Sequence, residues 1–157
     1  MNGLTALNTF GEIGNFIFQN LSFERDMDLI CFDLDNTLIN SEKAHVYAYN
    51  YALKKNCLPE WKFKDMVGLF GRPHGEVVSI LIHGRDRAII KRIKIEHDRV
   101  LVQQFFKYSR VKKGVRRILA ILNKKYRLAI VSNASHRSIA ALLHGAGLER
   151  SFFSAHI

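Results

Sequence analysis

A short apolar run that ends in two carboxylates is the feature that most limits how this chain can fold. Residues 29 to 38 read Leu-Ile-Cys-Phe-Asp-Leu-Asp-Asn-Thr-Leu. The run predicts a β-strand over 29–32, with Asp33 and Asp35 at its carboxyl end. In parallel α/β sheets, ligands bind at the carboxyl ends of the strands. Side chains at positions i and i+2 of a strand face the same way, so both acids are expected to point at one site.

Two carboxylates this close repel each other, and the arrangement is costly unless a cation lies beside them. A hard cation that prefers oxygen ligands, such as Mg2+, would remove that cost if it were shared with a phosphate group. The alternative is a polar turn that closes a buried strand, because Asp and Asn favour turns. The context favours chemistry, since the two acids stand between an apolar strand and a helical segment.

A second apolar run ends in small polar groups. Residues 128 to 133 read Leu-Ala-Ile-Val-Ser-Asn and predict a strand over 128–132. A helix is predicted from Ser135 to about His144, and its N-terminus would add N–H groups that bind anions. The alternative is an ordinary strand that ends at a helix N-cap.

Taken together, the two segments resemble motifs I and II of the haloacid dehalogenase-like (HAD) hydrolases. Motif II of that family is an apolar strand that ends in Thr or Ser, commonly followed by Asn, and Ser132 and Asn133 match it. Asn36 stands where many members carry Gly. Motif I is an apolar strand followed by Asp-x-Asp-x-Thr-Leu, a polar residue, Ser and Glu, and the matching residues are Asp33, Asp35, Thr37, Leu38, Ser41 and Glu42.

The resemblance implies a phosphatase, because the dehalogenases of the family lack an acid at the position of Asp35. Asp33 would attack phosphorus to form an aspartyl-phosphate, and Asp35 would act as general acid and base. The Asp33 carboxylate and the Asp35 main-chain carbonyl would hold Mg2+. Thr37 would fix the loop and, with Ser132 and Asn133, belong to the phosphate-binding set. The implied reaction is Mg2+-dependent hydrolysis of a small phosphorylated metabolite.

The segment between the motifs, residues 41–107, reads as mostly helical and resembles the small helical cap of many family members. A cap of that kind closes over the site, excludes water and contacts the substrate. Arg72 and His74, in a turn between two predicted helices, are candidates for substrate contact. The alternative for Arg72 is a surface residue that holds the turn.

The remaining residues, 29–40 and 108–157, predict a doubly wound parallel, Rossmann-like sheet from the order strand, helix, strand, helix, strand. A third strand is expected to begin near Phe152. Residues 1–28 form an N-terminal extension with an amphipathic pattern and no assigned chemistry. The strand over 29–32 is expected to be an unprotected sheet edge.

The family also needs a motif III Lys and motif IV acids, which follow the third strand. The chain reaches Ile157 as that strand begins, so no residue matches these motifs. The expectation is a truncated product, a fragment of a longer enzyme, or a chain completed by a partner. The alternative to a phosphatase is therefore a catalytically inactive remnant or a regulatory binding domain of the same fold.

Composition restricts the partners. The formal net charge is +10, with the basic excess densest between residues 85 and 127, which would attract phosphorylated ligands. No nucleic-acid-binding module accompanies the charge, so no specific nucleic-acid partner is expected. No apolar run approaches the ~20 residues that span a membrane, and signal-peptide features are lacking. Cys31 and Cys57 form no metal-ligand pattern or disulfide framework. These features predict a cytoplasmic protein, and none of them indicates an oligomeric state.

Overall fold

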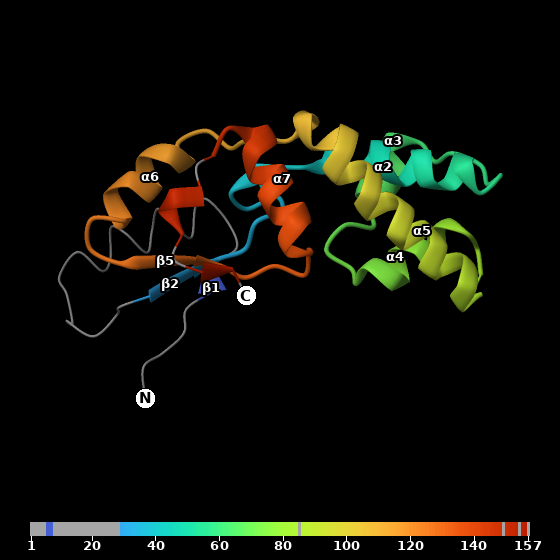
Figure 1. Cartoon of the computed structure of the whole chain (residues 1–157), viewed down its shortest axis with the longest axis horizontal. Helices are drawn as coiled ribbons and strands as arrows, with labels where there is room; N and C mark the ends of the chain where they lie inside the picture. The colour runs from blue at the N-terminus through green and yellow to red at the C-terminus, as the bar shows by residue number, and fades with distance from the viewer. Residues whose placement is uncertain (1–5, 8–28, 85, 149, 154, 157) are drawn as a thin grey trace.

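The protein is an α/β molecule built on a parallel sheet, as a computed structural model shows (Figure 1). The structure describes residues 6–7, 29–84, 86–148, 150–153 and 155–156. Neighbouring strands of the four-stranded sheet all pair in parallel, which confirms the predicted fold class. In spatial order the strands are β1 (Ala6–Leu7), β2 (Leu29–Phe32), β5 (Arg127–Ile130) and β6 (Ala155–His156).

The two central strands, β2 and β5, end side by side. Their register pairs Leu29 with Arg127 and Phe32 with Ile130, so both strands stop at the same edge of the sheet. Phe32 and Ile130 are fully buried. One further hydrogen bond, from the Val131 N–H to the Phe32 carbonyl (2.9 Å), carries the pairing past the end of β5. The segments after both strands therefore leave the sheet next to each other.

The other side of β2 is not an open edge. Ala6 pairs with Cys31 and Leu7 with Phe32, so β1 covers that side of the strand. The expectation of an unprotected edge at 29–32 was wrong, because it took no account of pairing by the N-terminal residues. The amphipathic pattern predicted for that extension lies in residues 8–28, outside the described residues.

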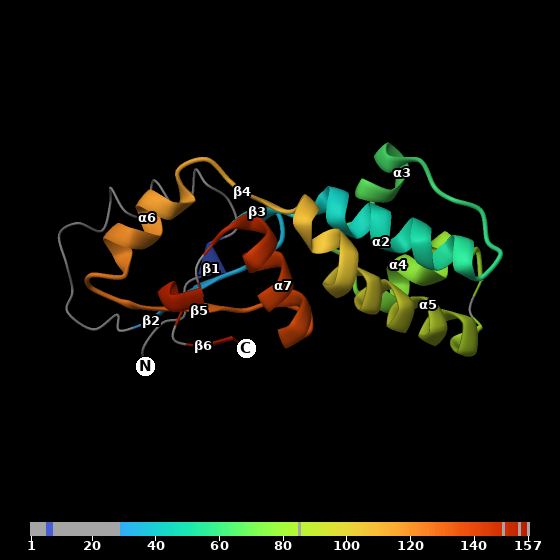
Figure 2. The ribbon, with the colours of Figure 1, turned by 45° about the horizontal axis from the view of Figure 1, so that its top comes forward.

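Helices α6 (Val115–Leu122) and α7 (His136–Ala146) lie over the same face of the sheet (Figures 1 and 2). Their buried side chains form a continuous apolar core with β2 and β5, to which Leu119 and Leu142 contribute fully buried side chains. Among the described residues, no helix is both long and apolar enough to cross a membrane.

Glycine has two different roles in α7. The sequence predicts that Gly145 and Gly147 both end the helix, but only Gly147 does so, as a left-handed C-cap with φ +65°. Gly145 lies inside the helix, where the chain segment around Phe106 passes very close to it. A Cβ atom at position 145 would lie 2.0 Å from the Phe106 carbonyl oxygen. The Ser109 hydroxyl joins the same two segments by donating a hydrogen bond to the Leu142 carbonyl (2.8 Å).

The segment over residues 41–109 is mostly helical and is called the helical insert below. It lies at the opposite end of the molecule from α6 (Figure 2). A two-stranded antiparallel ribbon, β3 (Ile39–Asn40) with β4 (Arg110–Val111), joins it to the sheet. Its elements are α2 (Glu42–Lys55), α3 (Phe63–Val67), α4 (His74–Leu81), α5 (Arg87–Val100), a π-helical turn (Leu101–Phe105) and a 3-10 turn (Phe106–Tyr108).

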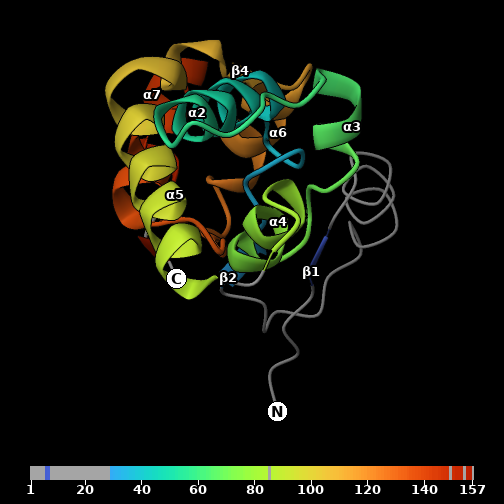
Figure 3. The same cartoon turned by 90° about the vertical axis from the view of Figure 1, so that its right-hand side faces the viewer.

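Helix α2 is buried on two sides. Ala44 and Ala48 belong to the main apolar core together with residues of β2 and β5, and Tyr49 belongs to a second apolar cluster inside the insert. The sequence spacing predicts one apolar face formed by Ala44, Tyr47, Ala48 and Tyr51, but residues Tyr47 and Tyr51 are 40% and 37% exposed. The reason is that α5 packs against α2 and α4 and defines a different inward face (Figure 3). The boundaries proposed for a core and a cap, at residues 41 and 107, stay a prediction.

Candidate active site at the ends of two strands

The loop after β2 is a tight turn that holds Asp33 in place. The amide groups of Leu38 and Ile39 both donate to the Leu34 carbonyl oxygen (3.0 and 3.2 Å), while the Leu34 side chain is fully buried. The hydroxyl of Thr37, itself buried, donates to Oδ2 of Asp33 (2.9 Å). Thr37 therefore fixes the orientation of the first predicted catalytic carboxylate.

Asn36 occupies the left-handed region of this turn, with φ +60°. Its side-chain amide donates to Glu42 Oε1 (3.2 Å), and its carbonyl oxygen accepts a hydrogen bond from the Lys112 ammonium group. Asn tolerates this backbone conformation better than most residues. The geometry explains why Asn can stand at a position that suits Gly.

A β-branched residue at position 36 is expected to strain the turn. We expect Asn36→Val to lower the free energy of unfolding by about 1–2 kcal/mol, because the left-handed conformation brings Cβ too close to the following carbonyl. Urea unfolding measures the effect, with Asn36→Gly as the matched control that leaves φ unrestricted. Equal stability of the Val and Gly variants would contradict this account.

Asp35 is held by residues of α2 rather than by its own loop. The Ser41 hydroxyl donates to Asp35 Oδ1, and His45 Nε2 lies 3.3 Å from the same oxygen. Burial alone would raise the pKa of Asp35, but the hydrogen bond and electrostatic interaction with His45, together with the Ser41 hydrogen bond, outweigh burial and lower it. Burial raises the pKa of Asp33, and the nearby charge of Asp35 adds to that rise against the opposing Thr37 hydrogen bond. The two carboxyl groups thus have different protonation preferences.

Ser132 and Asn133 follow β5 on the neighbouring strand. Because β2 and β5 end in register, these residues leave the same sheet edge as Asp33. Ser132 is partly buried, and its hydroxyl oxygen accepts a hydrogen bond from the Ala134 N–H (3.1 Å). Ser135 caps α7 by accepting from the Ser138 N–H (3.2 Å). The start of α7 therefore lies at the edge of the sheet where both motif segments meet.

The two residues predicted to contact substrate have different surroundings. Arg72 is exposed, and its Nη1 lies 2.5 Å from Glu76 Oε1 in the first turn of α4, as expected for a residue that holds a turn. His74 points into the insert, with its ring edge-on to Tyr49 and to His97. Substrate contact by Arg72 and His74 stays a prediction.

The structure adds a row of hydrogen-bonded side chains that the sequence did not reveal. His45 Nδ1 lies 3.2 Å from His97 Nε2, and their rings stack at 5.3 Å. His97 Nδ1 lies 2.9 Å from Asp98 Oδ1. The row thus connects Asp35 to Asp98 across α2 and α5. One signal was present in the sequence, since His97 falls at helical spacing between the inward-facing Ile93 and Val100.

Burial keeps two of the histidines neutral over a wide pH range. Burial lowers the pKa of His97 from an ordinary value of 6.5 to about 4, with Asp98 opposing the shift. Burial and the neighbouring His97 lower the pKa of His74 from 6.5 to about 3. Both rings therefore resist protonation as long as the insert is folded.

This resistance makes the fold sensitive to acid. Between pH 6.5 and about 3 the unfolded chain binds protons at His74 that the folded chain does not, so the free energy of unfolding falls as the pH falls. We expect His74→Gln to reduce the slope of the free energy of unfolding against pH by up to about 1.4 kcal/mol per pH unit. Urea unfolding at pH 7, 6 and 5 measures it, with His136→Gln, at the exposed first turn of α7, as control. Equal slopes for the wild type and His74→Gln would contradict this prediction.

Comparisons with known proteins agree with this arrangement. The sequence model of the haloacid dehalogenase-like hydrolase family matches residues 30–155. Three solved structures are similar over 83% of the chain: a haloacid dehalogenase-like family protein from Streptococcus pneumoniae (18% identity, TM-score 0.70), a predicted phosphatase from Clostridium acetobutylicum (17%, 0.73) and a predicted phosphoglycolate phosphatase from Haemophilus somnus (25%, 0.68). None of the curated proteins matches the chain.

The similarity covers only part of those structures. The chain spans 60%, 60% and 62% of their respective lengths. The family match includes β5 and all of β2 except Leu29.

Proposed function

The chain belongs to the haloacid dehalogenase-like hydrolase family, and on that premise we propose that its site hydrolyses small phosphate monoesters with the help of Mg2+. The observation that carries this proposal is the pair of acids at the end of β2, with Asp33 held by Thr37, beside the end of β5. Phosphoryl transfer depends on positioning and on electrostatic stabilisation, and a rigid carboxylate next to a polar strand end can supply both.

Asp33 is the proposed nucleophile. Its carboxylate oxygen attacks phosphorus, a bond forms between them, and the bond from phosphorus to the substrate oxygen breaks. The Thr37 hydroxyl holds Oδ2 and so limits the rotation of the carboxylate before attack. Water then attacks the aspartyl-phosphate, which releases phosphate and restores Asp33.

Asp35 is the proposed acid and base. As an acid it protonates the departing oxygen, and as a base it takes a proton from the attacking water. The hydrogen bonds from Ser41 and His45 favour its carboxylate form, which is the form needed as a base. A bound phosphate dianion brings negative charge close to Asp35, and this favours the protonated form that the first step needs.

The donor groups of the site suit a hard cation. The Asp33 carboxylate and the Asp35 main-chain carbonyl both offer oxygen, the ligand that Mg2+ prefers. The Asp35 side chain is engaged by Ser41 and His45, which leaves the carbonyl of that residue as the donor in the proposed site. When bound, Mg2+ supplies charge that reduces the repulsion between carboxylate and phosphate.

Ser132, Asn133 and the first turn of α7 are the proposed phosphate-binding groups, since a helix N-terminus and a hydroxyl both donate to anions. The helical insert is the proposed cap, with Arg72 as a substrate contact. Substrates of the small phosphorylated class fit the net charge of +10. A cytoplasmic location stays a prediction from the sequence.

Hydrolysis of p-nitrophenyl phosphate by the purified 157-residue chain tests the proposal. We expect turnover that requires Mg2+ and stops when EDTA is added. A folded chain with no turnover would contradict the proposed activity for this chain. That result would favour the alternative, a regulatory binding domain of the same fold. Binding of phosphate without turnover would then identify such a domain.

A further inference from the structure

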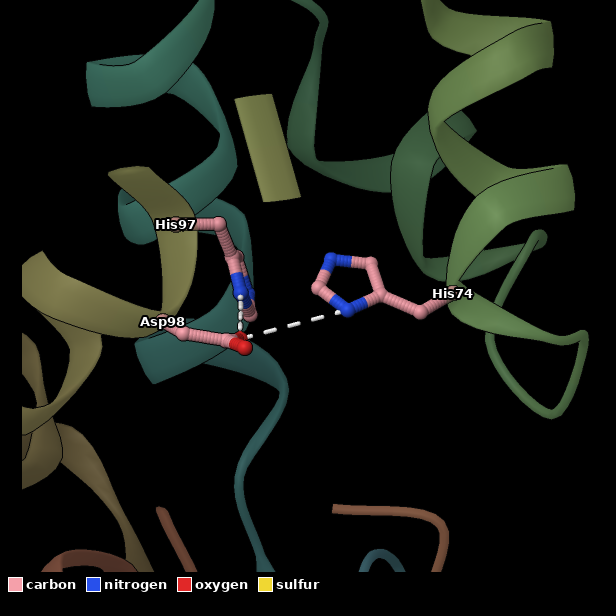
Figure 4. A group of neighbouring side chains, drawn as sticks. All are labelled: His74, His97 and Asp98. Atoms are coloured by element: carbon pink, nitrogen blue, oxygen red, sulfur yellow. Dashed lines mark hydrogen bonds and ion pairs between the residues drawn. The ribbon is translucent and has the colours of Figure 1, made fainter. Parts of the chain in front are cut away.

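Three side chains of the insert converge from two helices (Figure 4). His74 comes from α4, and His97 and Asp98 come from α5. One potential ligand atom from each lies within 4.8 Å of the other two. We propose that this cluster is a second metal site, which takes a transition-metal dication of the Zn2+ class and is separate from the proposed Mg2+ site.

The spacing of the ligand atoms fits a small tetrahedral ion. Zn2+ binds His nitrogen and carboxylate oxygen at about 2.0–2.2 Å, which places tetrahedral ligands about 3.3–3.5 Å from one another. Asp98 Oδ1 lies 2.9 Å from His97 Nδ1 and 3.9 Å from His74 Nδ1. These two distances bracket that value, and the ligand atoms of His74 and His97 lie within 4.8 Å of each other. The proposal therefore requires the two imidazoles to rotate toward each other when an ion binds.

The choice of donor atoms separates this site from the pair Asp33 and Asp35. Two imidazoles and one carboxylate suit Zn2+, Co2+ and Ni2+, whereas Mg2+ prefers oxygen ligands alone.

Further hydrogen bonds support His97 as a ligand. A metal on Nδ1 leaves the proton on Nε2, which faces His45 Nδ1 at 3.2 Å. His45 then presents its own Nε2–H to Asp35 Oδ1 at 3.3 Å. Metal-bound histidines typically donate their second N–H in this way, and the partner fixes the tautomer and the ring orientation.

The ligand atom proposed for His74 is Nδ1, which lies 3.9 Å from Asp98 Oδ1. Its other nitrogen, Nε2, is buried and has no hydrogen-bond partner among the described residues. Such atoms are rare in folded proteins, but a metal on Nδ1 would leave Nε2 unpartnered, so the proposal does not depend on it. Substrate contact by His74 stays a prediction.

Three protein ligands would leave a tetrahedral ion one position for a further ligand. Asp98 is 45% exposed and borders a surface hollow that also includes Arg87, Lys91 and Lys94. These three cationic side chains oppose a metal cation, and they favour an anionic fourth ligand. Three protein ligands with one exchangeable position form the arrangement of an accessible metal site rather than a closed structural one.

Titration of the full chain with Co2+ tests the proposal, because tetrahedral Co2+ has a visible absorption spectrum that needs no enzyme activity. We expect one equivalent to bind with a tetrahedral spectrum, and His74→Gln and Asp98→Asn to weaken that binding at least tenfold. Asp33→Asn and His136→Gln are the matched controls and are expected to retain it. Zn2+ is expected to displace Co2+ and to raise the melting temperature of the wild type but not of His74→Gln.

Two results would overturn the proposal. One is an absence of tetrahedral Co2+ binding by the folded wild-type chain. The other is binding that is lost in Asp33→Asn and kept in His74→Gln and Asp98→Asn, which would assign the ion to the acids after β2. His74→Gln and Asp98→Asn alter partly exposed side chains, and circular dichroism verifies that these two variants fold.

Discussion

Asp33→Asn is expected to lose about 10^4-fold or more in kcat for p-nitrophenyl phosphate in the presence of Mg2+. The amide cannot act as the nucleophile, so the step that forms the aspartyl-phosphate is removed rather than slowed. The fold should remain intact, because an amide oxygen at position 33 can still accept the hydrogen bond from Thr37. Initial rates over a range of substrate concentrations, measured beside the wild type, separate kcat from KM.

A matched control shows whether the loss belongs to this carboxylate. Asp65 is exposed in α3, and Asp65→Asn is expected to keep wild-type kcat and KM. The wild type and both variants should unfold at the same urea concentration. A folded Asp33→Asn that retains wild-type turnover would show that Asp33 is not the nucleophile and would leave the proposed mechanism without its first step.

The sheet and its site loop were predictable because their signals are local. The strands were predicted over the apolar runs 29–32 and 128–132, and the structure has β2 over Leu29–Phe32 and β5 over Arg127–Ile130. The turn after β2 is also local, since Thr37 reaches Asp33 across only four residues. The strand ends carrying the candidate chemistry could therefore be located from the sequence alone.

Other contacts depend on packing between distant segments. His45 and His97 are 52 residues apart and meet only because α2 packs against α5. The pairing of β1 with β2 likewise joins residues far apart in the chain. Helical spacing predicts Tyr47 and Ala48 on one apolar face of α2. The helix is covered on two sides, however, and a pattern with one apolar face per helix does not describe that burial. These features follow from the tertiary arrangement and leave little trace in any one segment.

Gly145→Ala is expected to be the most destabilising small substitution in α7. The added Cβ would lie 2.0 Å from the Phe106 carbonyl oxygen and 2.8 Å from the Ser109 hydroxyl oxygen. These are main-chain and buried groups, so the clash is relieved only by moving α7 away from the segment around Phe106. We expect the free energy of unfolding to fall by about 3 kcal/mol or more, measured by urea unfolding.

The matched control is Gly75→Ala in α4, where an added Cβ meets nothing within 4 Å. Ala is the better helix former, so that variant is expected to be unchanged or stabilised by up to about 1 kcal/mol. Equal effects of the two substitutions would contradict the close approach at Gly145. Because α7 begins at His136, three residues after Asn133, a displaced helix would also move the proposed phosphate-binding groups. Gly145→Ala is therefore expected to raise KM for p-nitrophenyl phosphate in the fraction that remains folded, whereas Gly75→Ala is not.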